Sequence, residues 1–306
     1  MKMNKHIYKN GNYIVIFDTD DGTKERITKA DKFVAEFPES IDLSVTTVCD
    51  GGCEFCYQGC TPDGEHADIL TPVFLRTLRP YTELAINGND LSHPDLMEFL
   101  HMMKEKNIIV NMTVRQTHFM RKFDFIKQII DEKLIYGLGV SLVRPTNNFI
   151  EKVKQFPNAV IHVINGIVTP LELEILSGEG LKLLILGYKR LSRGEAMYEE
   201  HGDEIEETKS WLYDKLPTII NEHWFDVVSF DNLALKQLDA KRLLSQEEWD
   251  EFYMGDDGQD GDMSSASMYI DLVNREYARN STCTERYPLE DDIVTMFDKL
   301  REGYEV

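Results

Sequence analysis

Short apolar runs typical of strands alternate with amphipathic helical stretches along most of the chain. The strand-like runs are 41–46, 83–86, 108–113, 137–142, 159–164, 182–186 and 226–230. Between them, apolar residues recur at helical spacing in 94–106, 118–132 and 203–221. In the first of these, Leu96, Phe99, Leu100 and Met103 follow the i, i+3, i+4, i+7 pattern of a single helix face. Strands that alternate with helices form parallel sheets, so the pattern predicts an α/β fold, either open or curled into a barrel.

Both ends of the chain depart from this alternation. Residues 5–28 predict a β-hairpin, because Asp21 and Gly22 form a turn signal between strand-like runs. Ser245 and Glu248 have the spacing of a capping box and predict a short helix. A second hairpin is expected over 267–280, and a last helix from Ile293. The acidic, glycine-rich stretch 255–262 lacks the ligand order of a calcium loop, so we expect a connecting loop there.

The charge and the cysteine content restrict the class of protein. The 306 residues carry a formal net charge of −21, which argues against a nucleic-acid polymer or an anionic membrane as partner, because both require basic surfaces. Met1–Asn10 does not have the pattern of a targeting segment, and we see no run long enough to span a membrane. Four of the five cysteines lie between 49 and 60, which is not the spacing of a secreted disulfide framework. We therefore expect a cytoplasmic protein with reduced thiols.

Cys49, Cys53 and Cys56 form a C-x3-C-x2-C motif directly after the first predicted strand. Ligands gather at the carboxyl ends of parallel strands, so the motif is expected at the ligand-binding end of the sheet. Three thiolates suit a [4Fe–4S] cluster with one open iron, whereas a structural zinc ion needs four ligands. Gly51 and Gly52 would let the backbone pass close to the cluster. A zinc site that uses Cys60 as its fourth ligand, or a chance clustering of cysteines, remains an alternative.

With Phe55 before the last cysteine, the motif resembles the C-x3-C-x-Φ-C signature (Φ, aromatic) of the radical S-adenosylmethionine (SAM) superfamily. The resemblance covers roughly 38–235 and implies a partial (β/α)6-type barrel. It leaves an N-terminal β-hairpin extension, 1–37, and a C-terminal α+β extension, 236–306, which we expect to cap the substrate pocket.

The resemblance also implies a chemistry. Cys49, Cys53 and Cys56 would bind a [4Fe–4S] cluster, and a one-electron donor such as flavodoxin or ferredoxin would reduce it. Electron transfer to SAM would give a 5′-deoxyadenosyl radical, which takes a hydrogen atom from the substrate.

The family's Gly-Gly-Glu-Pro motif, which holds the SAM amino group, corresponds here to Asn87-Gly88-Asn89-Asp90, and the following His-Pro-Asp-Leu matches at 93–96. Asn89 replaces a carboxylate. Its amide oxygen could still accept a hydrogen bond from the ammonium group, but it carries no charge and would bind that group more weakly. We therefore expect this protein to differ from its relatives at the amino group of SAM. The resemblance implies further SAM contacts at Phe55, Thr113, Arg115, Ser141, Ile164, Gly187 and Tyr188.

Two substrate classes fit the sequence: a peptide or amino-acid side chain, and a nucleoside-derived small metabolite. The rival from another class is a non-catalytic metal-binding module. Polar candidates for substrate contacts follow the last two predicted strands of the alternating series: Lys189, Arg190, Asp231, Asn232 and Lys236. Loop capping or solvation at a strand end is the plainer role for each of them. Cys283 is isolated, so the C-terminal region lacks the cysteines that bind additional clusters in many peptide-modifying relatives.

Overall fold

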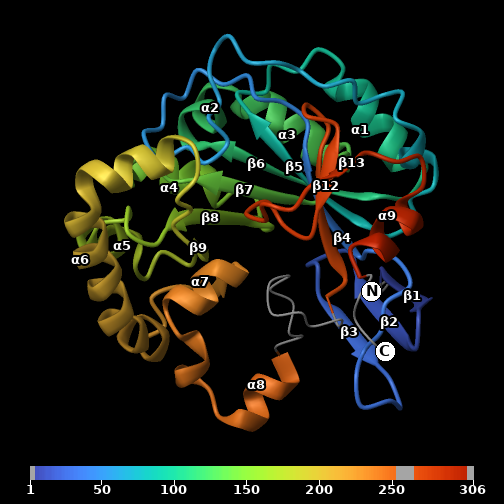
Figure 1. Ribbon diagram of the computed structural model, residues 1–306. Coiled ribbons are helices and arrows are strands. Elements are labelled where there is room, and N and C mark those ends of the chain that lie inside the picture. The colour runs from blue at the N-terminus through green and yellow to red at the C-terminus, as the bar shows by residue number, and fades with distance from the viewer. Residues whose placement is uncertain (1–3, 253–264, 302–306) are drawn as a thin grey trace.

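The computed structural model describes residues 4–252 and 265–301, and it arranges them in two sheets with helices around the larger one (Figure 1). The acidic stretch 255–262 lies outside the described residues. The small sheet is antiparallel and consists of β1 (Lys5–Asn10), β2 (Tyr13–Asp18) and β3 (Lys24–Ile27). The predicted N-terminal hairpin is thus a three-stranded sheet, because the strands on both sides of residues 11–12 pair as well.

The large sheet contains ten strands within the described residues, in the order β10-β9-β8-β7-β6-β5-β4-β11-β12-β13. Neighbouring strands from β10 to β11 are parallel, and β12 and β13 are antiparallel additions at one edge. In chain order the strands are β4 (Ser40–Ser44), β5 (Glu83–Asn89), β6 (Ile109–Arg115), β7 (Gly137–Ser141), β8 (Ala159–Ile164), β9 (Lys182–Leu186), β10 (Val227–Phe230), β11 (Ser267–Asp271), β12 (Glu276–Ala278) and β13 (Tyr287–Pro288). All seven predicted strands of the alternating series are present. In the described chain no pairing joins the two outer edges, so the sheet is open.

The helices lie mainly between the parallel strands in the chain. They are α1 (Leu96–Glu105), α2 (Gln116–Arg121), α3 (Phe123–Asp131), α4 (Asn147–Val153), α5 (Pro170–Leu176), α6 (Arg193–Asn221), α7 (Asn232–Gln237), α8 (Gln246–Phe252) and α9 (Ile293–Lys299). The helix predicted over 118–132 is two helices, because Lys122 leaves the helical region at φ −109° and ψ 25°. The helix predicted over 203–221 is the longer part of α6, and a kink at His201 (φ −124°, ψ 24°) separates it from a preceding helical segment that begins at Arg193.

The two faces of the parallel sheet differ in chemistry. Ile86, Met112 and Leu138 are partners in register, and all three are buried in the main apolar cluster. The next residues along the same strands, Asn87, Thr113 and Gly139, are also partners in register and point to the opposite face. Figure 1 shows α1 to α6 along the outer side of the sheet. The apolar face therefore packs on helices, and these helices do not cover the polar face.

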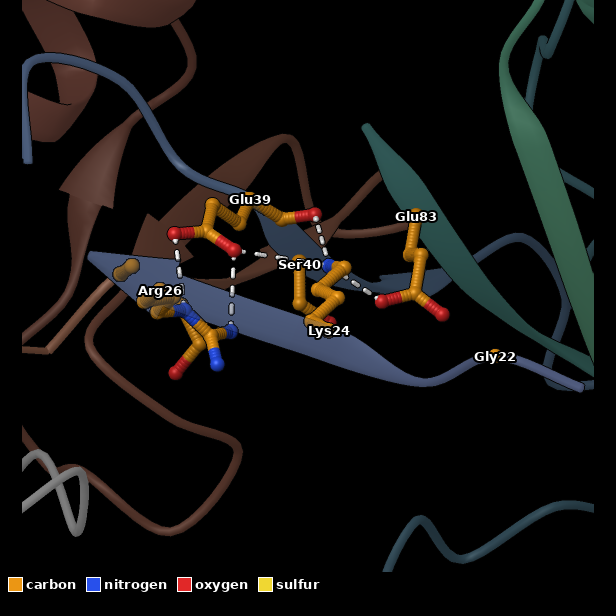
Figure 2. A pocket seen from close by; sticks show the side chains of 8 residues that line it. Gly22, Lys24, Arg26, Glu39, Ser40 and Glu83 are labelled. Carbon is orange, nitrogen blue, oxygen red and sulfur yellow. Dashed lines mark hydrogen bonds and ion pairs between the residues drawn. The ribbon is translucent and has the colours of Figure 1, made fainter. Parts of the chain in front are cut away.

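The N-terminal sheet is attached to the amino-terminal ends of β4 and β5 by a network of charges (Figure 2). The side chain of Glu39 is 1% exposed and accepts two hydrogen bonds from Arg26, at 3.2 and 2.9 Å, and one from Tyr13. Lys24 lies between Glu39 and Glu83, with Nζ 3.6 and 2.5 Å from their carboxylate oxygens. These groups line a cavity of about 330 Å³, far along the strands from the cysteines. Because two cations face two carboxylates, the network is compensated and serves to join the sheets.

The C-terminal segment returns to the large sheet. The predicted hairpin forms as β11 and β12, and β11 also pairs in parallel with β4. The capping box is present, with the Ser245 N–H donating to Glu248 at 2.8 Å and the Glu248 N–H donating to Ser245 Oγ at 3.2 Å. One apolar cluster includes Phe17 of β2, the sheet residues and Phe297 of α9, so the first and last segments share the core of the central one. No helix in the described ranges is both long and apolar enough to span a membrane.

Candidate functional site

The cysteine loop begins after the carboxyl end of β4 and is closed at its base by backbone hydrogen bonds. The Cys49 N–H donates to the Thr61 carbonyl at 2.9 Å, and the Thr61 N–H donates to the Thr47 carbonyl at 3.0 Å. Within the loop, the Gly51 N–H donates to Cys49 Sγ at 3.3 Å. A side chain at Gly51 would place its Cβ 3.1 Å from this sulfur and 3.0 Å from Arg115 Cδ. A side chain at this position would therefore crowd Cys49 and Arg115.

Asn87 and Asn89 hold the segment that leads into this loop. Asn87 accepts from the Val45 N–H at 2.7 Å and donates to the Thr46 carbonyl at 2.7 Å. Asn89 donates to the Thr46 and Val48 carbonyls, both at 3.1 Å. Its φ of +46° lies in the left-handed region, which asparagine tolerates better than most residues. A carboxylate at either position could not donate these bonds, which gives a structural reason for an amide at both.

Two helices anchor the loop from outside, and neither contact was anticipated from the sequence. Asp50 accepts hydrogen bonds from His118 and, at 3.1 Å, from Arg121, both on α2. These bonds hold the pKa of Asp50 below its ordinary value. At the start of α6, the Arg193 guanidinium donates to the Cys53 carbonyl and to the Cys60 carbonyl, each at 2.9 Å. Local sequence gave no signal for Arg193, because the contact spans well over a hundred residues.

The four clustered thiols differ in their environment. The pKa of Cys56 is lowered to about 5, and a hydrogen bond from Cys60 is the largest cause. Burial raises the pKa of Cys49 and of Cys53. Cys60 is 5% exposed and also receives the Asn89 amide at 3.5 Å. The structure therefore places Cys60 beside the triplet, in contact with Cys56.

Among the residues that the structure describes, no group of three His, Cys, Asp or Glu side chains is arranged around a single metal ion. A [4Fe–4S] cluster does not require such a group, because it takes each thiolate on a separate iron atom. The donor set of the loop fits that cluster in kind: three half-buried thiols on one short, glycine-containing segment.

Several predicted SAM contacts lie side by side on the open face of the sheet. Thr113 is in register with Asn87, and Arg115 is in register with Ser141. Ser141 is in turn beside His162 on β8. Gly139 leaves room for the imidazole of His162, since a Cβ there would overlap the ring. Burial lowers the pKa of His162 to about 4, so its ring is neutral at physiological pH.

The remaining predicted contacts lie around this face. Gly88 is buried between Met112 and Val114, and Ile164 ends β8 on the face of His162. Phe55 is half-buried within the loop.

Backbone groups of Gly187 and Tyr188, two of the predicted SAM contacts, are already hydrogen-bonded within the protein. The Gly187 N–H donates to Asp231 at 2.9 Å, and Gln237 bonds both the N–H and the carbonyl of Tyr188 at 3.0 Å. Gln237, on α7, is a further residue that the sequence did not single out.

A small cavity of about 100 Å³ lies at the carboxyl ends of β9 and β10. It brings together four of the five polar residues proposed for substrate contacts, and Arg190 is the exception, since it forms an exposed ion pair with Glu195. The C-terminal segment contributes Asn280, Ser281 and Thr282 to the same wall.

Comparisons with known proteins give a likeness in fold. No family model matches the sequence, and no curated protein matches it. Among solved structures, SuiB of Streptococcus suis bound to S-adenosylmethionine aligns with a TM-score of 0.62 and 12% identity, over 99% of this chain and 89% of that chain. SuiB bound to its precursor peptide SuiA aligns with a TM-score of 0.59, at 12% identity and the same coverage. The chain therefore has a mixed α/β fold similar to that of SuiB over nearly its whole length.

Proposed function

We propose that this chain is a radical SAM enzyme. The observation that carries the proposal is the position of Cys49, Cys53 and Cys56, on one loop at the carboxyl end of β4 and beside the open polar face of the sheet. The fold supports it, because the similar SuiB structure is bound to SAM. In this proposal the parallel strands correspond to a partial (β/α)6 barrel, and the segment 236–306 caps its substrate end. A bound [4Fe–4S] cluster would supply one electron, from a donor such as flavodoxin or ferredoxin, for cleavage of SAM to methionine and a 5′-deoxyadenosyl radical.

In this proposal, residues of the chain bind and orient the cluster and SAM. Cys49, Cys53 and Cys56 hold the cluster, and Arg193 and Asp50 fix the loop that carries them. In the described structure the Asn89 Oδ1 accepts no hydrogen bond, so it is our candidate acceptor for the SAM ammonium group.

The other SAM contacts are proposed in the same way. Thr113, Arg115 and Ser141 face the ribose and carboxylate. Phe55, Asn87, Gly88, Ile164, Gly187 and Tyr188 shape the walls by packing. Gly187 and Tyr188 act by contact, because their backbone groups are occupied.

Anaerobic reconstitution tests the proposal. The wild-type chain should bind about four iron and four sulfide per chain. With dithionite and SAM it should form 5′-deoxyadenosine, and Cys53→Ala should abolish both. One tightly bound zinc ion without SAM cleavage would overturn the proposal.

The second candidate is a non-catalytic module with a four-thiol zinc site, because Cys60 lies beside Cys56, although the thiols of the described chain are not arranged around a single metal ion. The two candidates differ in the behaviour of Cys60→Ala. A cluster held by three cysteines survives this substitution, whereas a zinc ion held by four thiolates is lost.

A peptide or amino-acid side chain is the substrate class we favour. The precursor peptide bound to the similar SuiB supports this choice over a nucleoside-derived metabolite.

A further inference from the structure

The cavity at the ends of β9 and β10 is built around a lysine. Lys189 follows β9 and is half-buried. Its ammonium group donates to Ser281 Oγ at 2.9 Å and lies 4.1 Å from the centre of the Tyr57 ring. Tyr57 is the residue after Cys56, and Ser281 belongs to the C-terminal segment. Lys189 thus joins the cysteine loop, the large sheet and the C-terminal segment at one point.

The charge of Lys189 is incompletely compensated. Within the described part of the chain it forms no ion pair, although Asp42 and Asp231 exert a longer-range attraction. Asp231 directs its Oδ1 to the N–H groups of Gly187 and Ala234, at 2.9 and 2.7 Å, and so serves as the cap of α7. Burial lowers the pKa of Lys189, which means that the surroundings disfavour the charged form. A desolvated ammonium group is stabilised most by a directly hydrogen-bonded anion.

The rest of the wall carries charges of both signs. Lys236 brings a second ammonium group to the cavity, and Asp42 and Asp231 bring two carboxylates, of which Asp231 is engaged as the cap of α7. The two groups in direct contact with the Lys189 ammonium are uncharged, because it donates to Ser281 Oγ and lies over the face of the Tyr57 ring. A carboxylate oxygen accepts hydrogen bonds only, and it matches donors of this kind.

We propose that this cavity binds a carboxylate of the substrate, through Lys189, and that the carboxylate belongs to an aspartate or glutamate side chain of a peptide. The inference rests on the proposed function, since it names the substrate class of that site. The size of the cavity supports a side chain, because about 100 Å³ is well below the roughly 300–1,000 Å³ that encloses a whole small molecule. The rest of the peptide would lie along the open polar face, and the contact with Tyr57 keeps the anchored residue beside the cysteine loop.

A defined peptide library tests the inference. The probe is a synthetic pentapeptide library with acetylated and amidated ends, so that only side chains carry carboxylates. The full-length reconstituted protein is equilibrated with the library, and bound peptides are quantified by mass spectrometry. We expect Asp or Glu at one position to be enriched about tenfold over Asn or Gln, as a charge-assisted hydrogen bond provides. Lys189→Met should remove the enrichment and Lys189→Arg should retain part of it.

Control variants and a second library separate the possible causes of the result. Lys127→Met removes an exposed lysine of α3 that pairs with Asp131, and it should bind as the wild type does. If Lys189→Met does not fold, Ser281→Ala, which removes the acceptor that orients the ammonium group, should still reduce the enrichment. A second library with free carboxyl ends separates the sources: enrichment only there, without an acidic side chain, would overturn the side-chain assignment. Equal selection by the wild type and Lys189→Met would overturn the carboxylate site itself.

Binding and SAM cleavage are measured separately, so the two proposals fail separately. Formation of 5′-deoxyadenosine without selection of acidic peptides would refute the pocket and leave the enzyme. Selection that depends on Lys189, without cluster binding or SAM cleavage, would refute the enzyme and leave an acidic-peptide site.

Discussion

Arg193 should control how tightly the cysteine loop is closed, and this can be measured without a cluster. Its guanidinium joins the start of α6 to the Cys53 and Cys60 carbonyls, each at 2.9 Å. In Arg193→Met both carbonyls lose their charged donor. Hydrogen bonds to a charged group contribute about 1.5–3 kcal/mol each when buried, and partial solvation reduces the pair to about 2 kcal/mol in total. That difference corresponds to an increase of roughly 30-fold in the population of the open loop.

Alkylation of Cys60 by iodoacetamide, followed residue by residue by mass spectrometry, reports this opening. Cys60 is 5% exposed, so it reacts mainly when the loop opens. In the protein without a cluster, Arg193→Met should react roughly 30-fold faster at Cys60 than the wild type does. Lys at this position keeps the charge but cannot reach both carbonyls, so Arg193→Lys should lie between the two.

Arg190→Met is the matched control, because Arg190 lies three residues earlier and, in the described part of the chain, its contacts are an exposed ion pair with Glu195 and the ring of Tyr198. Its Cys60 should react as in the wild type. If Arg193→Met and the wild type react at the same rate, the two hydrogen bonds do not hold the loop and the reasoning fails.

Three further substitutions have defined outcomes. The pKa of His162 is about 4 in the folded chain and near 6.5 in the unfolded chain. Between pH 6.5 and pH 4 only the unfolded chain binds this proton, so the free energy of unfolding falls as the pH is lowered through that range. His162→Gln should therefore flatten the fall in urea-unfolding free energy from pH 7 to pH 5, a fall of up to about 2 kcal/mol in the wild type; equal slopes would contradict this. Gly88→Ala would place a Cβ 2.8 Å from Met112 and 2.9 Å from Val114, and overpacking of this kind should cost about 1–3 kcal/mol in the same assay. Glu39→Gln leaves Arg26 and Lys24 without their shared carboxylate and should cost about 3–5 kcal/mol, whereas an unchanged midpoint would show that the network is dispensable.

The strands and the cysteine motif could be predicted because their signals are local. A buried parallel strand appears in the sequence as a short apolar run. The three-thiol loop appears as three cysteines separated by three and then two residues. The break at Lys122 and the segment of α6 that precedes the kink at His201 were missed for the opposite reason. Residues 193–202 carry few apolar side chains, so no periodicity marks them as helical, and it is contact with the cysteine loop that fixes the first turn.

The sequence by itself determined the alternation of elements and the end of the sheet at which the thiols lie, and it predicts the chemical kind of the site. The tertiary structure alone decided which groups share it. Asn89 donates to the loop backbone, Cys60 contacts Cys56, and Lys189 meets Ser281 across 92 residues. Such contacts depend on strand register and on the path of the C-terminal segment, and neither is encoded in any local window of the chain. The sheet order, with β11 beside β4, is the physical reason that the C-terminal segment reaches the pocket at all.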